Sequence, residues 1–277
     1  MPALRILILA STLAGGLSAA AEASSAPTPD VTVGSQYTTT HVYVARADFD
    51  RFVASFVATF GGKASKQDVV TVTPTPSRTL WQPVRSPVGN LSVFGYETPA
   101  PYPFGSERTG CLVTDIDTAV QAARDDGAAA IVSPFPDPIG RDVIMQWPRG
   151  VNMQLYWHTK PPSHEPPLLT VPENRVYVSS DRADTFIRDF VAFSHGAVTS
   201  DDAAAPGIEI GRPGEAYRLV RIDSAFGKVA VLVTDGHLPW PYGRELVSPY
   251  AANGRVSAMV EFPGGYIVEI HAAARPS

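Results

Sequence analysis

Two side chains near the C-terminus have the spacing of a metal-binding pair. Glu269 and His271 are two residues apart in a β-like stretch, so both side chains would lie on one face of a strand. A carboxylate and an imidazole are both ligands of divalent metals, but metal sites use three or four ligands. The pair is therefore only part of a site, and a salt bridge between Glu269 and a cation such as Arg175 is the alternative interpretation.

The sequence lacks the common motifs of nucleophilic, nucleotide and zinc-protease chemistry. It contains no Gly-x-Ser-x-Gly, no phosphate-binding loop, no dinucleotide fingerprint and no HExxH. Cys111 is the only cysteine, so it can form neither an internal disulfide nor a CxxC site. Because it lies in an apolar stretch with no neighbouring base, we expect it to be buried rather than nucleophilic.

The elements that would position such side chains are organised in two copies. Residues 41–44 align with residues 175–178 at an offset of 134. Residues 101–107 read Pro-Tyr-Pro-Phe-Gly-Ser-Glu and align with residues 239–245, Pro-Trp-Pro-Tyr-Gly-Arg-Glu, at an offset of 138. So many matches in the same order indicate a duplication of the chain.

The second copy is shorter than the first. Matches after residue 131 have offsets of 114 or 115 instead of 138, and the fall from 138 to 115 means that the second copy lacks 23 residues. The missing residues correspond to 108–130, which have the pattern of one strand and one helix.

The proline and aromatic motif joins one repeating unit to the next in both copies. The prolines would stiffen the connection, and the rings would either close the mouth of a barrel or line a ligand pocket. We favour the structural role because both copies retain the motif.

Each unit has a strand, a helix and three further strands. Residues 40–45 alternate like a strand, and apolar residues from Phe49 to Phe60 recur at helical spacing before Gly61-Gly62. Three β-like stretches follow, at 69–73, 79–85 and 90–96. Residues 109–158 repeat this order, 174–235 form a third unit, and 246–272 form only the last strands of a fourth. The pattern predicts an α+β protein of tandem βαβββ units.

Composition limits the partners of the protein. The 277 residues include 22 basic and 27 acidic ones, giving a net charge of −5, and no basic run follows any segment. We therefore expect no nucleic-acid partner. The hydrophobic fraction of 44% is enough for buried cores, while 26 prolines and 22 glycines favour a β-rich protein.

Residues 1–23 are predicted to be a signal peptide. Arg5 precedes a short apolar stretch that ends at Ala21-Glu22-Ala23, an A-x-A-like cleavage site. Cleavage would leave a flexible lead at 24–37 and a periplasmic or secreted protein. The stretch is too short and too rich in Gly and Ala for a good membrane span, so none is expected after cleavage. A buried N-terminal helix is the alternative.

Paired βαβββ units resemble the vicinal oxygen chelate superfamily, which includes glyoxalases, bleomycin-resistance proteins and extradiol dioxygenases. The resemblance rests on His41-Val42-Tyr43-Val44 before a helix, on residues 113–120 as a strand-to-helix junction, and on closing strands at 150–155 and 265–270. It implies two glyoxalase-like half-barrels, at 38–158 and, in shortened form, at 173–272. Residues 159–172 would be a proline-rich linker.

The resemblance also implies where a divalent metal would bind. His41 occupies the first-strand ligand position of the first unit, and Val93, which cannot bind a metal, occupies its closing-strand position. In the second unit, Arg108 lies near the first-strand position and Gln154 at the closing one. An arginine is not a metal ligand and an amide is a weak one, so the set is incomplete.

The second copy keeps one family ligand. Arg175 replaces histidine at its first-strand position, Val231 stands at the next closing position, and Glu269 matches the closing-strand glutamate. The candidate metal ligands are thus His41 and Glu269.

Two functions remain open, and both have a small-molecule partner. In the first, an exported lyase, isomerase or dioxygenase acts on a dicarbonyl, a catechol or a hydroxy acid in the first half-barrel. His41 would be a ligand or general base, Gln154 would orient a substrate oxygen, and Arg108 would lie at the edge. In the second, a metal-free protein of the same fold binds and sequesters its ligand.

Overall fold

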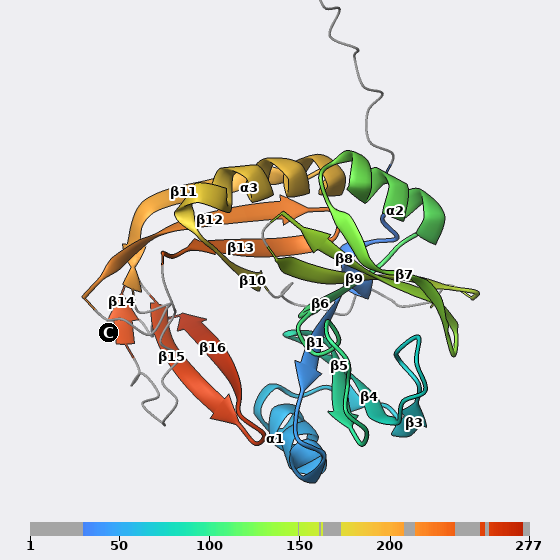
Figure 1. Cartoon of the computed structure of the whole chain (residues 1–277). Helices are drawn as coiled ribbons and strands as arrows, with labels where there is room; N and C mark the ends of the chain where they lie inside the picture. The colour runs from blue at the N-terminus through green and yellow to red at the C-terminus, as the bar shows by residue number, and fades with distance from the viewer. Residues whose placement is uncertain are drawn as a thin grey trace, which may run out of the picture.

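The structure is a computed structural model that describes residues 30–148, 150–160, 162, 173–207, 214–235, 250–252 and 255–273. The predicted signal peptide, the second aromatic motif and residues 163–172 of the predicted linker lie outside the described residues. The chain is a mixed α+β protein in which strands predominate (Figure 1). None of the described helices is long and apolar enough to cross a membrane.

The first copy forms one nine-stranded sheet. Its helices are α1 (Phe49–Phe60) and α2 (Ile116–Asp125), and two 3-10 turns, η1 (Ser35–Tyr37) and η2 (Arg46–Asp48), flank the first strand. Its strands are β1 (Thr39–Tyr43), β2 (Lys63–Ala64), β3 (Asp68–Val70), β4 (Thr79–Ser86), β5 (Gly89–Tyr96), β6 (Thr109–Leu112), β7 (Ala129–Asp137), β8 (Gly140–Trp147) and β9 (Val151–His158). The order is β2-β4-β5-β1-β6-β9-β8-β7, and β3 pairs with β4.

The unit order predicted from the sequence is present, with one strand more than expected. The short strands β2 and β3 both lie along β4, where the sequence indicated a single strand. Helix α1 has the predicted bounds and ends where Gly61, at a φ of 75°, donates its N–H to the carbonyl of Val57. Helix α2 begins at the N-cap Asp115, which accepts a hydrogen bond of 2.7 Å from the N–H of Thr118.

Successive side chains along each strand of this sheet point to opposite faces of the sheet. One face packs on α1 and α2, and its side chains, such as Val42, Leu80, Val93 and Leu155, are almost fully buried. We call this the helix face. The opposite face carries polar and aromatic side chains, many of them only half-buried, and we call it the polar face. Among its residues are Thr39, His41, Tyr43, Ser92, Gln154 and Tyr156.

The second copy does not form one continuous sheet. Strands β10 (Glu173–Val178), β11 (Ala197–Pro206), β12 (Ala216–Ser224) and β13 (Gly227–Val233) form a four-stranded sheet with helix α3 (Ser180–Ser194). Strands β14 (Tyr250–Ala252), β15 (Arg255–Phe262) and β16 (Tyr266–Ala273) form a separate antiparallel sheet.

The described strands of the region predicted to be a shortened half-barrel, at 173–272, are thus divided between two sheets. In the first copy, β6 pairs with both β1 and β9 and thereby joins the two units. The 23 residues missing from the second copy are the counterpart of β6 and α2. Among the described residues, no strand pairs with both β10 and β16.

The helix faces of the two copies pack against each other (Figure 1). Helix α1 lies between the first sheet and the β15–β16 hairpin, where the ring of Phe262 is 5.9 Å from that of Phe52 and 5.6 Å from that of Phe56. Helices α2 and α3 share a second core, in which Trp147 contacts Phe190 and Phe193. The polar face of the first sheet is therefore directed away from the contact between the copies.

The described part of the lead predicted at 24–37 is not flexible, because its residues 31–33 are hydrogen-bonded to the first copy. The N–H of Val33 donates to the carbonyl of Leu112, and the N–H of Thr114 donates to the carbonyl of Val31. The side chain of Val31 is buried in the core shared by α2 and α3.

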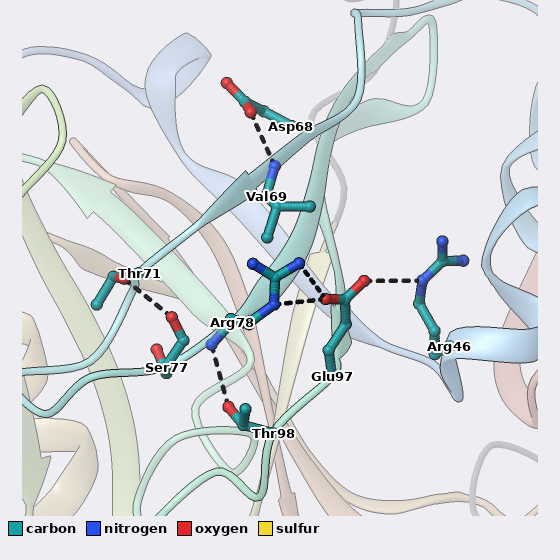
Figure 2. A network of polar contacts seen from close by, with 8 residues as sticks. All are labelled: Arg46, Asp68, Val69, Thr71, Ser77, Arg78, Glu97 and Thr98. Atoms are coloured by element: carbon teal, nitrogen blue, oxygen red, sulfur yellow. Dashed lines mark hydrogen bonds and ion pairs between the residues drawn. The ribbon is translucent and has the colours of Figure 1, made fainter.

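A cluster of ion pairs holds the end of β5 in place. Glu97 accepts hydrogen bonds from Arg78, which precedes β4, and from Arg46, in the turn η2 (Figure 2). The N–H of Arg78 also donates to Thr98, and Thr71 donates to the carbonyl of Ser77. The cluster therefore anchors the start of the loop between β5 and β6.

Candidate functional site

Three residues singled out by the sequence come from neighbouring strands of the polar face or from its edge. His41 is on β1, Gln154 is on β9, and β6 lies between these two strands. Gly110 of β6 pairs in register with Gln154, so these two positions point to the same face. Arg108 immediately precedes β6, and its carbonyl accepts a hydrogen bond of 2.9 Å from the N–H of His41.

His41 is buried beneath polar and aromatic neighbours. Its side chain is about 3% exposed, and its ring makes an edge contact with Phe94 at 5.3 Å between centroids. Its Nδ1 lies 3.3 Å from the hydroxyl of Tyr43 and 3.8 Å from Oε1 of Glu107. The Tyr43 hydroxyl in turn donates a hydrogen bond to Glu107.

Glu107 is the residue of this cluster that sequence reasoning did not assign to the site. It is 1% exposed, and its Oε2 is buried without a hydrogen-bond partner among the described residues. A signal for it was present, because it ends the aromatic motif and has a counterpart at Glu245 in the second copy. From the motif, the sequence predicted roles only for the prolines and the aromatic rings.

The position of the His41 ring depends on a glycine. A Cβ atom added to Gly110 would lie 2.4 Å from Nε2 of His41 and 3.0 Å from Oγ1 of Thr39. Side-chain atoms do not approach this closely, so His41 and Thr39 occupy space that any other residue at position 110 would fill.

A cation lies at the edge of the cluster. Arg108 is exposed, and its guanidinium carbon is 5.9 Å from the centroid of the Tyr43 ring. Tyr43 is stacked on Phe94 and Tyr96. Burial and the negative charge of Glu107 raise the pKa of Tyr43 well above its usual value of 10, so its hydroxyl keeps its proton.

Gln154 is held by a buried carboxyl group. Its amide donates a hydrogen bond of 2.6 Å to Oδ2 of Asp142, on β8. Burial, with the negative charges of Asp137 and Glu107, raises the pKa of Asp142 well above its usual value, although the hydrogen bond from Gln154 opposes this. Gln154 is therefore oriented in a network that links β8 and β9 to the polar face.

The aromatic motif crosses between the two units of the first copy. The hydroxyl of Tyr102 accepts hydrogen bonds of 3.3 Å from both Gln146 and Asn152, and Asn152 also donates to Ser106 at 2.8 Å. The ring of Phe104 meets that of Phe135 on β7. The motif thus contacts β7 and is hydrogen-bonded to β8 and β9, and its last residue, Glu107, reaches Tyr43 of β1.

The closing-strand position beside His41 is Ser92, not Val93 as predicted. Ser92 pairs in register with His41, while Val93 is fully buried on the helix face. The same one-residue correction applies to the second copy, where Ala230 pairs with Arg175 and Val231 is buried in a core. The reason is the two-residue period of a strand, in which a shift of one residue reverses the face.

Glu269 forms the ion pair with Arg175 that the sequence left open as the alternative to a metal-binding pair. Its carboxylate pairs with Arg175 of β10, and the Glu269 side chain is only 4% exposed. The pair links the two separate sheets of the second copy. Beside Arg175, the corresponding face of the second sheet packs the apolar residues Leu219 and Leu232.

Comparisons with known proteins identify the fold. The chain matches no protein-family model, and no curated protein is significantly similar to it in sequence. Among solved structures, homoprotocatechuate 2,3-dioxygenase from Arthrobacter globiformis has a TM-score of 0.51 at 13% identity, covering 89% of this chain and 81% of that one. A variant of the same enzyme from B. fuscum has a TM-score of 0.53 at 13% identity, covering 90% and 74%.

The chain shares the fold of these dioxygenases, in agreement with the fold that the resemblance to the vicinal oxygen chelate superfamily implies. A 4-hydroxymandelate synthase from Streptomyces coelicolor is also similar, with a TM-score of 0.48 at 16% identity over 74% of this chain and 66% of that one. At these identities, the comparisons show the fold alone.

Residues at the family's ligand positions do not fit a divalent metal. Around His41, the neighbouring positions hold Ser92, Gly110 and Gln154, which supply a hydroxyl, no side chain and an amide. In the described part of the chain, no three His, Cys, Asp or Glu side chains lie together in a way that could hold an ion. Glu107 is an acidic neighbour of His41, and it accepts a hydrogen bond from Tyr43.

Proposed function

We propose that this protein acts on a small oxygen-bearing molecule at the polar face of its first sheet, through proton transfer at His41 and without a metal held by the described residues. The reaction would be of the isomerase or lyase type. A dioxygenase reaction has less support, because the residues around His41 do not form a ligand set for the metal that activates dioxygen.

The observation that carries the proposal is the unpartnered oxygen of Glu107. A buried acceptor without a hydrogen bond costs about 1–3 kcal/mol, and more when the group is charged. In this cluster it lies next to a histidine and close to an exposed arginine. A ligand with a hydroxyl group would satisfy Oε2, and an anionic group on the same ligand would pair with Arg108.

Each side chain would have a separate part in the reaction. His41 would take or return a proton, Gln154 would orient a ligand oxygen, and Arg108 would hold the anionic end at the edge of the polar face. Because His41 and Glu107 are buried, their electrostatic interactions with a ligand are stronger than they would be in water.

A second candidate function is supported by the incomplete ligand set. The same donors and acceptors could bind and sequester a small carboxylate or hydroxy compound without converting it. Turnover distinguishes the two candidates, because a binder would return the compound unchanged.

We also propose that the protein is exported, as residues 1–23 suggest, and that its two copies correspond to a complete half-barrel at 38–158 and a shortened one at 173–272. The nine-stranded sheet of the first copy and the split sheets of the second copy support the difference in completeness.

The deciding experiment compares His41→Ala with Glu269→Gln. Small dicarbonyls, hydroxy acids and aromatic carboxylates would be screened by calorimetry and for turnover against the purified chain. His41→Ala should lower affinity or kcat/KM about tenfold or more, and Glu269→Gln should change either less than about twofold. If Glu269→Gln is the damaging variant and His41→Ala is silent, the site belongs to the second copy.

Metal analysis of the same preparation tests the metal-free part of the proposal. We expect iron, manganese, nickel and zinc far below one ion per chain. A stoichiometric metal that His41→Ala removes would overturn the proton-transfer chemistry.

A further inference from the structure

Two buried side chains and the half-buried Tyr43 between them form a continuous hydrogen-bonded row on the polar face. The row runs from Nδ1 of His41 to the hydroxyl of Tyr43 at 3.3 Å, and from this hydroxyl to Oε1 of Glu107. Nδ1 of His41 and Oε1 of Glu107 are 3.8 Å apart, too far for a direct hydrogen bond. Tyr43 is therefore the link between the imidazole and the carboxylate.

Counting protons along this row determines the tautomer of His41. A tyrosine hydroxyl has a single proton, and Tyr43 donates it to Glu107. Its oxygen can then only accept a hydrogen bond from His41, so the proton of the imidazole must be on Nδ1. In a neutral ring this leaves Nε2 as the unprotonated nitrogen.

The unprotonated nitrogen lies over the backbone of β6. A side chain at position 110 would collide with Nε2, and Oγ1 of Thr39 lies near the same point. Gln154 pairs with Gly110 in register on the neighbouring strand β9, and its amide donates to Asp142 on β8.

We propose that Tyr43 and Glu107 are positioning residues that hold His41 in the tautomer protonated at Nδ1, so that Nε2 is the atom that exchanges a proton with the ligand. This rests on the proposed function only for the existence of the ligand. The tautomer itself is a property of the free protein.

The proton balance of the step follows from this arrangement. The O–H or C–H bond of the ligand breaks, its electron pair stays on the ligand, and a new N–H bond forms at Nε2. The imidazolium produced has its positive charge facing the carboxylate of Glu107, which would stabilise it in a site largely closed to water. The reverse transfer returns the proton to the product.

Nitrogen NMR of the free protein tests the tautomer directly. The chain would be labelled with 15N-histidine, and a His41→Gln variant would identify the His41 signals among those of the six histidines. We expect a protonated Nδ1 and an unprotonated Nε2 in the neutral form. The opposite pattern would overturn the proposal.

Replacement of the carboxylate should reverse the tautomer. In Glu107→Leu, the Tyr43 hydroxyl loses its acceptor and turns to donate to Nδ1, so the proton should move to Nε2. Glu107→Asp keeps a carboxylate and should retain the wild-type tautomer, as should Tyr96→Phe, a control in a ring stacked on Tyr43. If Glu107→Leu folds, as judged by circular dichroism, and the tautomer is unchanged, the positioning role is wrong. If Glu107→Leu does not fold, the spectra of the wild type and of Glu107→Asp still test the proposal, because both must show a protonated Nδ1 of His41.

Failure of this proposal and failure of the proposed function give different results. If the wild-type tautomer is as expected but His41→Ala binds and turns over every ligand normally, the row of hydrogen bonds is real and the proposed function is wrong. If His41→Ala is inactive but Glu107→Leu, once reversed in tautomer, keeps its rate within about twofold, the site is correct and the positioning role is wrong. We expect Glu107→Leu to lose about a hundredfold in rate, both because the tautomer is reversed and because Oε2 no longer contacts the ligand.

Discussion

His41 and Glu107 are far apart in the sequence, but Nδ1 of His41 lies 3.8 Å from Oε1 of Glu107. The His41 ring can take this position because residue 110 is a glycine. The ring of His41 lies where a side chain at position 110 would otherwise be. The position of the His41 ring on the polar face therefore depends on a residue that has no side chain.

The substitution Gly110→Ala should displace the ring of His41. The added methyl group would meet Nε2 at 2.4 Å, so the ring must rotate away from its hydrogen bond with Tyr43. We expect a cost of about 1–3 kcal/mol in the free energy of unfolding and about a tenfold loss of ligand affinity. Chemical denaturation and calorimetry would measure these. An unmoved His41 NMR signal with unchanged affinity would contradict the prediction.

The buried carboxyl of Asp142 should make stability depend on pH. Because its pKa is raised in the folded chain, its contribution is complete below about pH 3.8 and is lost as the pH rises toward the folded pKa. Asp142→Asn keeps an acceptor for Gln154 and removes the ionisation. It should therefore gain at least about 1 kcal/mol over the wild type at pH 7, and less at pH 4, in urea denaturation.

Asp115 provides a control of opposite sign. The hydrogen bond from Thr118 lowers its pKa, so its charged form contributes stability above the unfolded pKa and loses it at acid pH. Asp115→Asn should thus fall further below the wild type as the pH rises. If both variants shift in the same direction, burial is not the cause of the Asp142 effect.

The loop between β5 and β6 joins the two units of the first copy and also places Glu107 beside Tyr43. Tyr102 and Ser106 bind it to β8 and β9, and Glu107 at its end enters the His41 cluster. Glu97 anchors its start (Figure 2). The structural and functional interpretations of the aromatic motif are therefore compatible, since the loop that joins the units also delivers the carboxylate.

The β15–β16 hairpin depends on α1, an element of the other copy. Phe262 is almost fully buried against the rings of Phe52, Phe56 and Phe60. Phe262→Ala should cost about 3–5 kcal/mol in the free energy of unfolding and increase hydrogen exchange in β15 and β16. Val198→Ala, at an exposed position of β11, should cost less than about 0.5 kcal/mol. Protection of β15 and β16 that survives Phe262→Ala would show that the hairpin is held by other contacts.

The two copies carry different side chains on equivalent faces. The polar face of the first copy carries His41 and Gln154, and the equivalent face of the second copy carries Arg175 beside apolar residues. The first copy contains β6, which is the strand between His41 on β1 and Gln154 on β9. The second copy lacks the counterpart of β6 and carries the Arg175–Glu269 ion pair between its two sheets. The two copies share their cores, and the candidate site of the proposed function lies in the first copy.

Export predicts the N-terminus of the mature protein. Expression in a bacterial host with a secretory pathway should yield a chain that begins near Ser24, measured by mass spectrometry of the exported fraction. The small residues Ala21 and Ala23 set this position, as in other signal-peptide cleavage sites. Recovery of the exported protein with Met1 intact would contradict the prediction.

The order and type of the elements were determined by the sequence itself. The helical spacing from Phe49 to Phe60, the glycines that follow it, and the alternation along β4 and β5 are local patterns that depend on neighbouring residues. The duplication likewise needs only the comparison of one stretch with another. For the same reason, burial of Cys111 was predictable from its apolar surroundings, and it is confirmed.

The face on which each strand residue lies, and the partners of each charge, were decided only by the tertiary structure. Ser92 rather than Val93 stands beside His41 because the register between β1 and β5 differs by one residue from the one expected, and a strand has a period of two. Glu107 reaches Tyr43 across 64 residues, and Glu269 reaches Arg175 across 94. Such contacts depend on how loops close and sheets pack, which no local pattern in the chain specifies.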